Sequence, residues 1–187
     1  HNTCAGPPSS GGGVRGPGPR VDPPRLRYLL WDYLRVDPRN IHAYVMGEHG
    51  DSEFVPWSQA MIATRPIREI VEGSGNSFDM EELDRISEEV KGAAYRIIEA
   101  KRATYYGIGM AMTRITKAIL GDENSVLTVS ALLGGEYGQS GVYAGVPCII
   151  NQNGIQRVLA LKLTEEELGK MAASCEILRE SFYGLES

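Results

Sequence analysis

Long apolar runs, basic patches and paired cysteines are all missing from this sequence. No apolar run approaches the roughly 20 residues that cross a bilayer, so a membrane partner is not expected. The net charge of -5, without any stripe of basic and aromatic residues, argues against nucleic acid as a partner. The three cysteines, Cys4, Cys148 and Cys175, have no metal-site spacing, and the start lacks the layout of a secretory signal. We therefore expect a cytoplasmic protein with reduced thiols and no bound metal.

The first 20 residues differ in composition from the rest of the chain. They are rich in Gly, Pro and Ser and offer almost no apolar side chain whose burial could offset the entropy lost on ordering. We predict that residues 1–20 are disordered, and we hypothesise that they reflect a shifted reading frame or a truncated gene. The whole chain is 42% hydrophobic and 23% charged, which is ordinary for soluble proteins. Residues 21–187 are predicted to form one domain.

Apolar residues recur at helical spacing in four segments. The predicted helices span residues 25–34, 79–101 and 103–120, with a last helix that begins after Thr164. Thr164 is predicted to cap this last helix, with Glu167 completing a capping box. Its predicted buried face consists of Leu168, Met171, Ala172, Cys175 and Leu178. Cys148 and Cys175 lie among apolar residues and are expected to fill the core rather than to act as nucleophiles.

Apolar and β-branched runs predict strands in the other segments. The predicted strands span residues 41–46, 53–57, 126–133, 143–151 and 154–161. The last two form a hairpin around the Asn-Gln-Asn-Gly turn at 151–154, the strongest hairpin signal in the chain. Residues 58–64 are predicted to be a short helical piece. This order of elements predicts an α+β fold in which long helices pack on an antiparallel sheet.

The loop after the first predicted strand carries the strongest sign of chemistry. His49 lies in the segment MGEHGDS (46–52), between glycines and acidic residues. A histidine in such a loop can turn toward a ligand, and a neighbouring carboxylate can tune its protonation, as proton transfer near neutral pH requires. The alternative is a histidine that only bridges the loop. Because glycines flank His49 and no apolar face surrounds it, we predict that it is functional.

Other polar residues permit both a functional and a structural interpretation. Asp22 and Arg25 share one face of a helix start, where they can orient an imidazolium and hold a carboxylate. They can equally be an acid favoured by the helix dipole and a solvated arginine. Thr104 can contact a ligand or bond to its own helix. Arg27 and His42 can hold an anion or be solvated side chains, and the residues alone leave these alternatives open.

Five motifs follow one another along the chain. They are Asp22-x-x-Arg25-Leu26-Arg27, GEHGDSE with PWS (47–58), KRATYYGIG (101–109), SVLTVSALLGGEYG (125–138) and GVPCIINQNGI (145–155). Together they resemble the C-terminal, substrate-binding half of bacterial-type L-lactate dehydrogenases, within the lactate/malate dehydrogenase family. The resemblance covers the chain from about Val21 to Phe182 and implies the α+β fold of that domain, with the N-terminal Rossmann domain absent.

The resemblance implies a role for each candidate residue. His49 is expected to be the acid/base that protonates the carbonyl of pyruvate, with Asp22 as the carboxylate that holds its imidazole. Arg25 is expected to bind the substrate carboxylate, and Thr104 to lie beside the substrate. Ile108 is expected to form an apolar wall near the nicotinamide of NAD.

The resemblance also implies regulation and assembly. Arg27 and His42 match positions at which allosteric bacterial members bind fructose 1,6-bisphosphate across a subunit interface. A homotetramer is expected, with a 2-oxo or 2-hydroxy acid as substrate. The implied reaction interconverts pyruvate and L-lactate with NADH and NAD, in glycolysis and pyruvate fermentation.

The nucleotide-binding half of the family is not recognisable in this sequence. Gly11-Gly12-Gly13 is not predicted to be a phosphate loop, because no strand precedes it and prolines follow it. We therefore expect the isolated chain to be inactive. A malate dehydrogenase domain is the alternative enzyme, although Glu48, Trp57 and Thr104 resemble the lactate enzymes better. A non-catalytic fragment that acts only through subunit association is the alternative outside enzymes.

Overall fold

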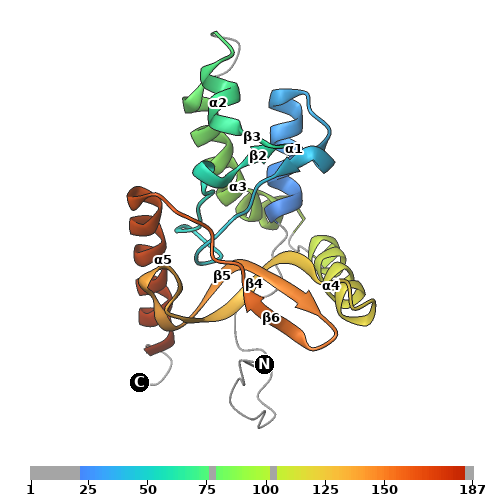
Figure 1. Cartoon of the computed structure of the whole chain (residues 1–187), viewed down its shortest axis with the longest axis vertical. Helices are drawn as coiled ribbons and strands as arrows, with labels where there is room; N and C mark the ends of the chain where they lie inside the picture. The colour runs from blue at the N-terminus through green and yellow to red at the C-terminus, as the bar shows by residue number, and fades with distance from the viewer. Residues whose placement is uncertain (1–21, 76–78, 102–104, 184–187) are drawn as a thin grey trace.

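The computed structural model describes residues 22–75, 79–101 and 105–183, which form an upper and a lower part (Figure 1). The upper part contains α1 (Asp22–Leu34), β1 (Ile41–His42), β2 (Met61–Ile62), β3 (Arg65–Pro66), α2 (Ile67–Glu72) and α3 (Met80–Lys101). The lower part contains α4 (Tyr105–Leu120), β4 (Ser125–Gly134), β5 (Ser140–Asn151), β6 (Gly154–Val158) and α5 (Glu165–Tyr183). Short 3-10 helices are η1 (Pro38–Asn40), η2 (Trp57–Gln59) and η3 (Glu136–Gly138). The predicted α+β fold of helices on antiparallel sheets is confirmed.

The upper core forms between α1, α3 and the small sheet β1-β2-β3. Helix α1 buries Leu26, Leu30 and Leu34, whose four-residue spacing places them on one helix face. Leu83 on α3 is fully buried in the same cluster. The Tyr33 hydroxyl accepts a hydrogen bond from the Asp79 amide at 2.7 Å, which ties the start of α3 to α1. The predicted helices at 25–34 and 79–101 are confirmed, with α1 beginning three residues earlier at Asp22.

The lower core forms around the central strand β5, which pairs antiparallel with β4 and β6. Helices α4 and α5 both contact β5 and lie on either side of the sheet in Figure 1. Because helices cover this strand, residues 144–148 are buried without the alternation of a half-exposed strand. The predicted hairpin is confirmed, with Asn151 paired to Gly154, although β6 ends at Val158 rather than at residue 161.

Cys148 on β5 and Cys175 on α5 are fully buried, so the prediction that they fill the core is confirmed. Burial, assisted by the charge of Glu136, raises the pKa of the Cys148 thiol to about 12. Burial also raises the pKa of Cys175, against a smaller opposing effect of Arg179. Both thiols therefore keep their protons near neutral pH, which is not the state of a nucleophile. Cys4 lies outside the described residues.

The predicted strands at 41–46 and 53–57 are largely wrong. Only Ile41–His42 forms a strand there, and Met46 and Phe54 pair as an isolated bridge. These apolar residues are buried because the chain passes from one core to the other, with Val45 and Val55 in the upper core. A segment that is buried at every residue therefore has the apolar sequence of a strand, even though it does not pair with other strands. The predicted helical piece at 58–64 is also wrong, since η2 ends at Gln59 and β2 follows.

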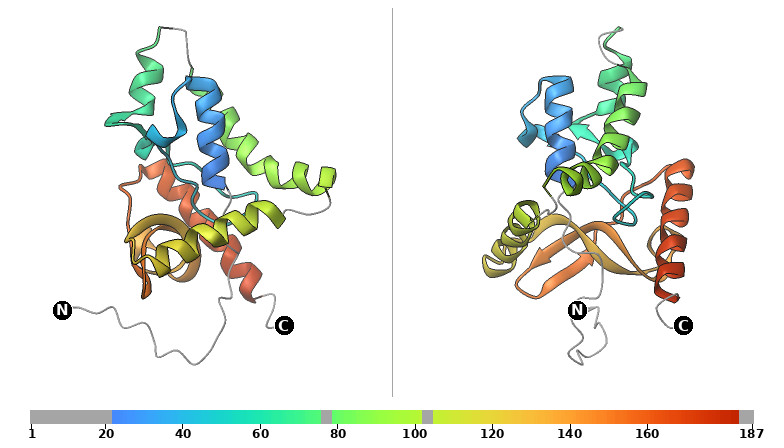
Figure 2. Two further views of the ribbon diagram at one scale, coloured as in Figure 1. Left: turned by 90° about the vertical axis from the view of Figure 1, so that its right-hand side faces the viewer. Right: turned by 180° about the vertical axis from the view of Figure 1, so that it is seen from behind.

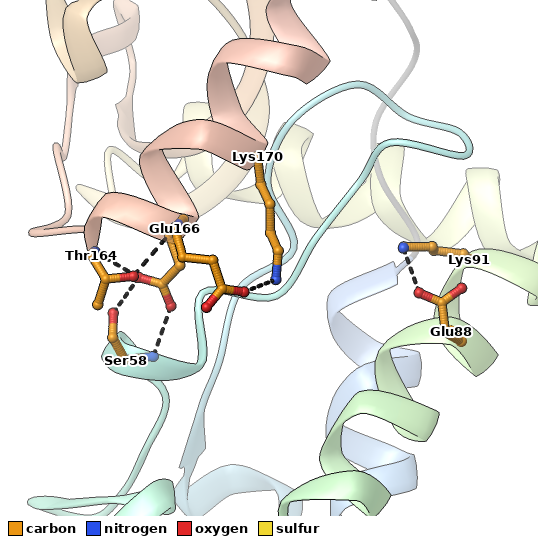
Figure 3. A network of polar contacts seen from close by, with 7 residues as sticks. Ser58, Glu88, Lys91, Thr164, Glu166 and Lys170 are labelled. Carbon is orange, nitrogen blue, oxygen red and sulfur yellow. Dashed lines mark hydrogen bonds and ion pairs between the residues drawn. The ribbon is translucent and has the colours of Figure 1, made fainter.

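Helix α5 begins with the predicted capping box, which is confirmed. The Thr164 amide donates to Glu167 Oε2 at 2.9 Å, and the Glu167 amide donates to Thr164 Oγ1 at 3.3 Å. Ser58 of η2 adds two more hydrogen bonds, because its amide donates to Glu167 Oε1 at 3.0 Å and its hydroxyl donates to Oε2 (Figure 3). The predicted buried face needs one correction. Glu167 is buried, whereas its neighbour Leu168 is exposed.

The inward face of α5 therefore begins at Glu167 and continues through Met171, Ser174 and Cys175, at three- and four-residue spacing. Leu168 lies one position further along the helix, about 100° away around its axis, and faces outward. Within the described ranges, no helix is long and apolar enough to cross a bilayer. Over the same ranges, no three His, Cys, Asp or Glu side chains gather in a way that could hold a metal ion.

We call the hydrogen bonds of Glu167 to Ser58 and Thr164 the clamp between η2 and α5. We expect this clamp to make a contribution to stability that is lost in acid. Burial raises the pKa of the Glu167 carboxyl, but the hydrogen bonds from Ser58 and Thr164 outweigh burial and leave the pKa below the ordinary value. Glu167→Gln is expected to lower the free energy of unfolding at pH 7 by about 1–2 kcal/mol, because an NH₂ group would then face an N–H or O–H donor. A depressed pKa stabilises the fold above the unfolded value of 4.5, and this contribution is lost as the pH falls through the folded value.

Urea unfolding at pH 7 and at about pH 3 measures this difference, which should shrink at the lower pH. Glu166→Gln is the matched control, since Glu166 is exposed and pairs with Lys170 at the surface (Figure 3). The control should stay close to the wild type. Equal losses in the two variants would contradict the clamp.

Candidate functional site

The predicted histidine loop lies where the two cores meet. Met46 and Phe54 belong to the lower core, and each donates its amide to the other's carbonyl, at 2.8 and 3.0 Å. This pairing closes a loop over residues 47–53. Gly47 also pairs with Gly145 of β5 through two backbone hydrogen bonds, of 3.0 and 2.9 Å. We call these four residues, Met46, Gly47, Phe54 and Gly145, the neck of the loop.

The two glycines of the motif meet specific steric demands. Gly47 has a φ of +94°, a conformation that residues with a side chain rarely adopt. A Cβ at Gly47 would also lie 2.5 Å from Ser174 Oγ on α5. At Gly50, a Cβ would overlap the carboxylate of Glu48, which folds back over the loop. The Ser52 hydroxyl donates to this carboxylate at 2.8 Å. Glycine at position 47 therefore allows the loop to fold tightly against α5, whereas a Cβ at Gly50 would displace the end of the Glu48 side chain.

His49 pairs with a carboxylate within its own loop. Its Nδ1 lies 3.4 Å from Glu53 Oε2. The Glu53 side chain is 3% exposed, whereas the His49 side chain is 30% exposed. The imidazole can thus be reached from solvent while a buried carboxylate lies beside Nδ1. Such a carboxylate selects the ring orientation and stabilises the protonated form.

Sequence reasoning did not single out Glu53. Asp22 is the predicted carboxylate partner of His49, but the Asp22 side chain lies outside the described part of the structure, so this pairing stays a prediction. Glu53 could have been found from two signals. It follows His49 by four residues, and it directly precedes the buried run Phe54-Val55-Pro56-Trp57. A carboxylate at the edge of a buried run needs a partner.

Arg25 lies on α1, with its guanidinium directed toward α3. Its Nη2 is 3.6 Å from Glu89 Oε1, and the two side chains are 32% and 44% exposed. This distance is long for a charge-assisted hydrogen bond, which is typically about 2.7–2.9 Å. The Arg25 Nε is buried and has no hydrogen-bond partner among the described residues. Because the Arg25 side chain is 32% exposed, part of its guanidinium can be reached from solvent beside the weak ion pair with Glu89.

The remaining predicted residues lie apart along the fold. Ile108, in the first turn of α4, has a side chain that is 39% exposed. Thr104 lies outside the described residues. Arg27 is half-buried on α1, and no residue in the described part of the chain bonds to its buried Nε. His42 is exposed on β1, opposite Met61 of β2. Helix α1 and strand β1 pack against each other, so Arg27 and His42 lie on neighbouring elements.

A family comparison decides what kind of domain this is. Residues 20–185 match the family described as lactate/malate dehydrogenase, alpha/beta C-terminal domain. The chain belongs to the lactate/malate dehydrogenase family. The resemblance found in the sequence motifs, and the fold it implies, are thereby confirmed.

Individual relatives agree with the family match. L-lactate dehydrogenase 2 of Bacillus cereus is 52% identical over 168 residues, or 90% of this chain and 53% of that protein. A lactate dehydrogenase from a Medee basin deep-sea metagenome library has a similar structure, with a TM-score of 0.85 and 43% identity, over 91% of this chain and 54% of that chain.

The minor L-lactate dehydrogenase of Enterococcus mundtii, in its ligand-bound form, gives a TM-score of 0.83 at 44% identity. This match covers 87% of our chain and 52% of that one. The chain thus spans about half the length of the curated relatives it matches. In this lactate/malate dehydrogenase domain, every candidate residue lies within the matched range 20–185.

The contact between His49 and Glu53 leads to a testable prediction about the protonation of the His49 imidazole. Glu53→Gln is expected to move the titration midpoint of the His49 imidazole to lower pH, because the neutral amide no longer stabilises the charged ring. The midpoint is measured by NMR on the 187-residue chain, with His49→Gln used to assign the resonance. The resonance of His42 on β1 is the internal reference and should not move. An unchanged His49 midpoint would show that Glu53 does not act on the ring.

Proposed function

We propose that this chain is the substrate-binding and catalytic domain of an L-lactate dehydrogenase, which interconverts pyruvate and L-lactate. One observation carries the proposal. A solvent-accessible imidazole pairs with a buried carboxylate in a loop held at the meeting point of two cores. The chain around this loop is 52% identical to an L-lactate dehydrogenase of Bacillus cereus.

His49 is proposed to move the proton of the reaction. Because Nδ1 lies beside Glu53, Nε2 is the ring nitrogen that would give a proton to the carbonyl oxygen of pyruvate and take it back from lactate. A protonated imidazole also neutralises the negative charge that develops on that oxygen. Asp22 is proposed to act as a further carboxylate partner of the ring, on the strength of the motif that it shares with Arg25.

Arg25 is proposed to bind the carboxylate of the substrate. A guanidinium can donate two parallel hydrogen bonds to a carboxylate, which fixes orientation as well as charge. The ion pair with Glu89 does not compete strongly, since it is 3.6 Å long and partly exposed to solvent. Thr104, three residues after the end of α3, is proposed to lie beside the substrate, supported by its place in the KRATYYGIG motif.

NAD is the cofactor that the family implies, and one described residue, Ile108, is suited to contact its nicotinamide ring. Ile108 presents an exposed apolar side chain in the first turn of α4, as a contact to a flat nicotinamide ring requires. NADH, when bound, supplies the hydride. Ile108 would hold the ring face and keep water from it.

Regulation and assembly are also proposed by likeness to the family. Arg27, a half-buried guanidinium on α1, and the exposed His42 on the neighbouring β1 offer nitrogen donors for an anion such as fructose 1,6-bisphosphate. Exposed apolar side chains on α4, including Met110 and Leu120, support association into a homotetramer. We propose that the enzyme works in the cytoplasm, in pyruvate fermentation.

A chimaera tests the proposed reaction. Residues 20–187 are fused to the N-terminal half of Bacillus cereus L-lactate dehydrogenase 2, and NADH oxidation is followed with pyruvate or oxaloacetate. The chimaera is expected to reduce pyruvate, and the unfused chain is expected to be inactive. His49→Gln should lower kcat about 10²- to 10⁴-fold. Preference for oxaloacetate would favour a malate dehydrogenase domain, and a folded but inactive chimaera would favour a fragment that acts by association alone.

The proposed binding of the substrate carboxylate by Arg25 can be tested separately in the same chimaera. Arg25→Lys is expected to lower kcat/KM for pyruvate about 10- to 100-fold, mainly through KM, because an ammonium group cannot donate two parallel hydrogen bonds. Arg35→Lys is the matched control, since Arg35 forms an exposed ion pair with Asp32. Initial rates over a range of pyruvate concentrations measure both variants. An Arg25→Lys variant with the KM of the control would contradict carboxylate binding by Arg25.

A further inference from the structure

Ser174 is a fully buried polar residue on the inward face of α5. Its neighbours on that face, Met171 and Cys175, are fully buried as well. A hydroxyl group in such surroundings is costly unless it is hydrogen-bonded. Its partners come from the histidine loop. The Glu48 amide donates to Ser174 Oγ, and Ser52 Oγ lies 3.1 Å from the same atom. In the right-hand view of Figure 2, the segment that contains this loop reaches α5.

These contacts close a ring of hydrogen bonds whose direction can be deduced. The Ser52 hydroxyl donates to Glu48 Oε2 at 2.8 Å, because a carboxylate oxygen can only accept. The single proton of Ser52 is therefore used, so the proton between the two serines must come from Ser174. The ring runs from the Glu48 amide to Ser174, from Ser174 to Ser52, and from Ser52 to the Glu48 carboxylate.

In the sequence, His49 lies between Glu48 and Ser52, which are both members of this ring. Glu48 precedes the histidine directly, and Ser52 directly precedes Glu53, the carboxylate at Nδ1. Holding Glu48 and Ser52 to one buried atom thus fixes both the backbone that carries the imidazole and the backbone that carries its partner. Gly47 shows how close the approach is, since even a Cβ at that position would lie 2.5 Å from Ser174 Oγ. The loop can approach α5 this closely only where both residues are small.

We propose that Ser174, from the last helix of the chain, is a positioning residue for His49. The inference rests on the proposed function insofar as His49 transfers a proton, but the geometry it asserts can be tested without activity. Ser174 is fully buried, so a ligand in the solvent-accessible site would not reach its hydroxyl group. It acts through Glu48 and Ser52, and it couples the docking of α5 to the orientation of the imidazole.

The test compares serines whose hydroxyl groups have different hydrogen-bond partners. Ser174→Ala removes the acceptor of the Glu48 amide, and Ser52→Ala breaks the ring from the loop side. Ser181→Ala is the matched control on the same helix, because the Ser181 hydroxyl donates to Ile177 O of its own helix at 2.8 Å. The first measurement is the NMR resonance of the His49 imidazole in the 187-residue chain. Ser174→Ala and Ser52→Ala should shift or broaden it, and Ser181→Ala should not.

The second measurement is the single-turnover rate of NADH oxidation by the pyruvate-reducing chimaera, well below its unfolding temperature. Ser174→Ala is expected to lower this rate about three- to tenfold, the effect of losing one hydrogen bond, with KM for pyruvate unchanged because Arg25 is not in the ring. Combining it with Ser52→Ala should cause little further loss, since both changes break one ring.

The outcomes separate positioning from packing. A Ser174→Ala variant that melts at lower temperature but keeps the wild-type His49 resonance and rate would overturn the proposal. If Ser174→Ala does not fold, Ser52→Ala decides in the same way, and an unchanged resonance and rate overturn it. If the wild-type chimaera does not reduce pyruvate, the proposed function fails, and the His49 resonance alone then decides whether Ser174 positions the ring.

Discussion

The backbone pairing at the neck of the histidine loop is the constraint on which the rest of the site depends. Met46 bonds to Phe54, and Gly47 bonds to Gly145 of β5, in each case through two backbone hydrogen bonds. The chain enters the lower core at Met46 and leaves it at Phe54, so the neck lies where the chain passes between the two cores. These bonds hold the base of the loop against β5, while the adjoining residues Val45 and Val55 are buried in the upper core, so packing on both sides restricts the position of the loop.

Side chains from the end of the chain add to this constraint. Helix α5 contacts the segment around the loop at two levels, through Glu167 to Ser58 and through Ser174 to Glu48 and Ser52. Both polar residues are buried, and each has its partners outside α5 as well as the apolar neighbours of its own helix. Buried polar groups with specific partners select one register of packing, because any rotation of the helix would leave them unsatisfied. Helix α5 therefore orients the loop as well as covering β5.

How far the sequence predicted the fold depends on whether each element is determined locally. The helices at α1, α3 and α4, and the β5–β6 hairpin, were predictable because their periodicity, caps and turn residues lie within the element itself. The segments 41–46 and 53–57 were not, since their burial comes from two cores that the sequence does not show to be adjacent. The prediction that Leu168 is buried was wrong for a related reason. The polar Glu167 takes the buried position because Ser58 supplies its hydrogen-bond partners.

The sequence by itself determined the family, the long helices and the β5–β6 hairpin, and it predicted His49 as the functional residue. Those conclusions rest on motifs and periodicities that are properties of contiguous residues. Only the tertiary structure decided that Arg25 faces Glu89 and that Ser174 contacts a loop 126 positions away. Contacts between residues distant in sequence depend on how the cores pack, and no local pattern encodes the distance between two side chains that only packing brings together.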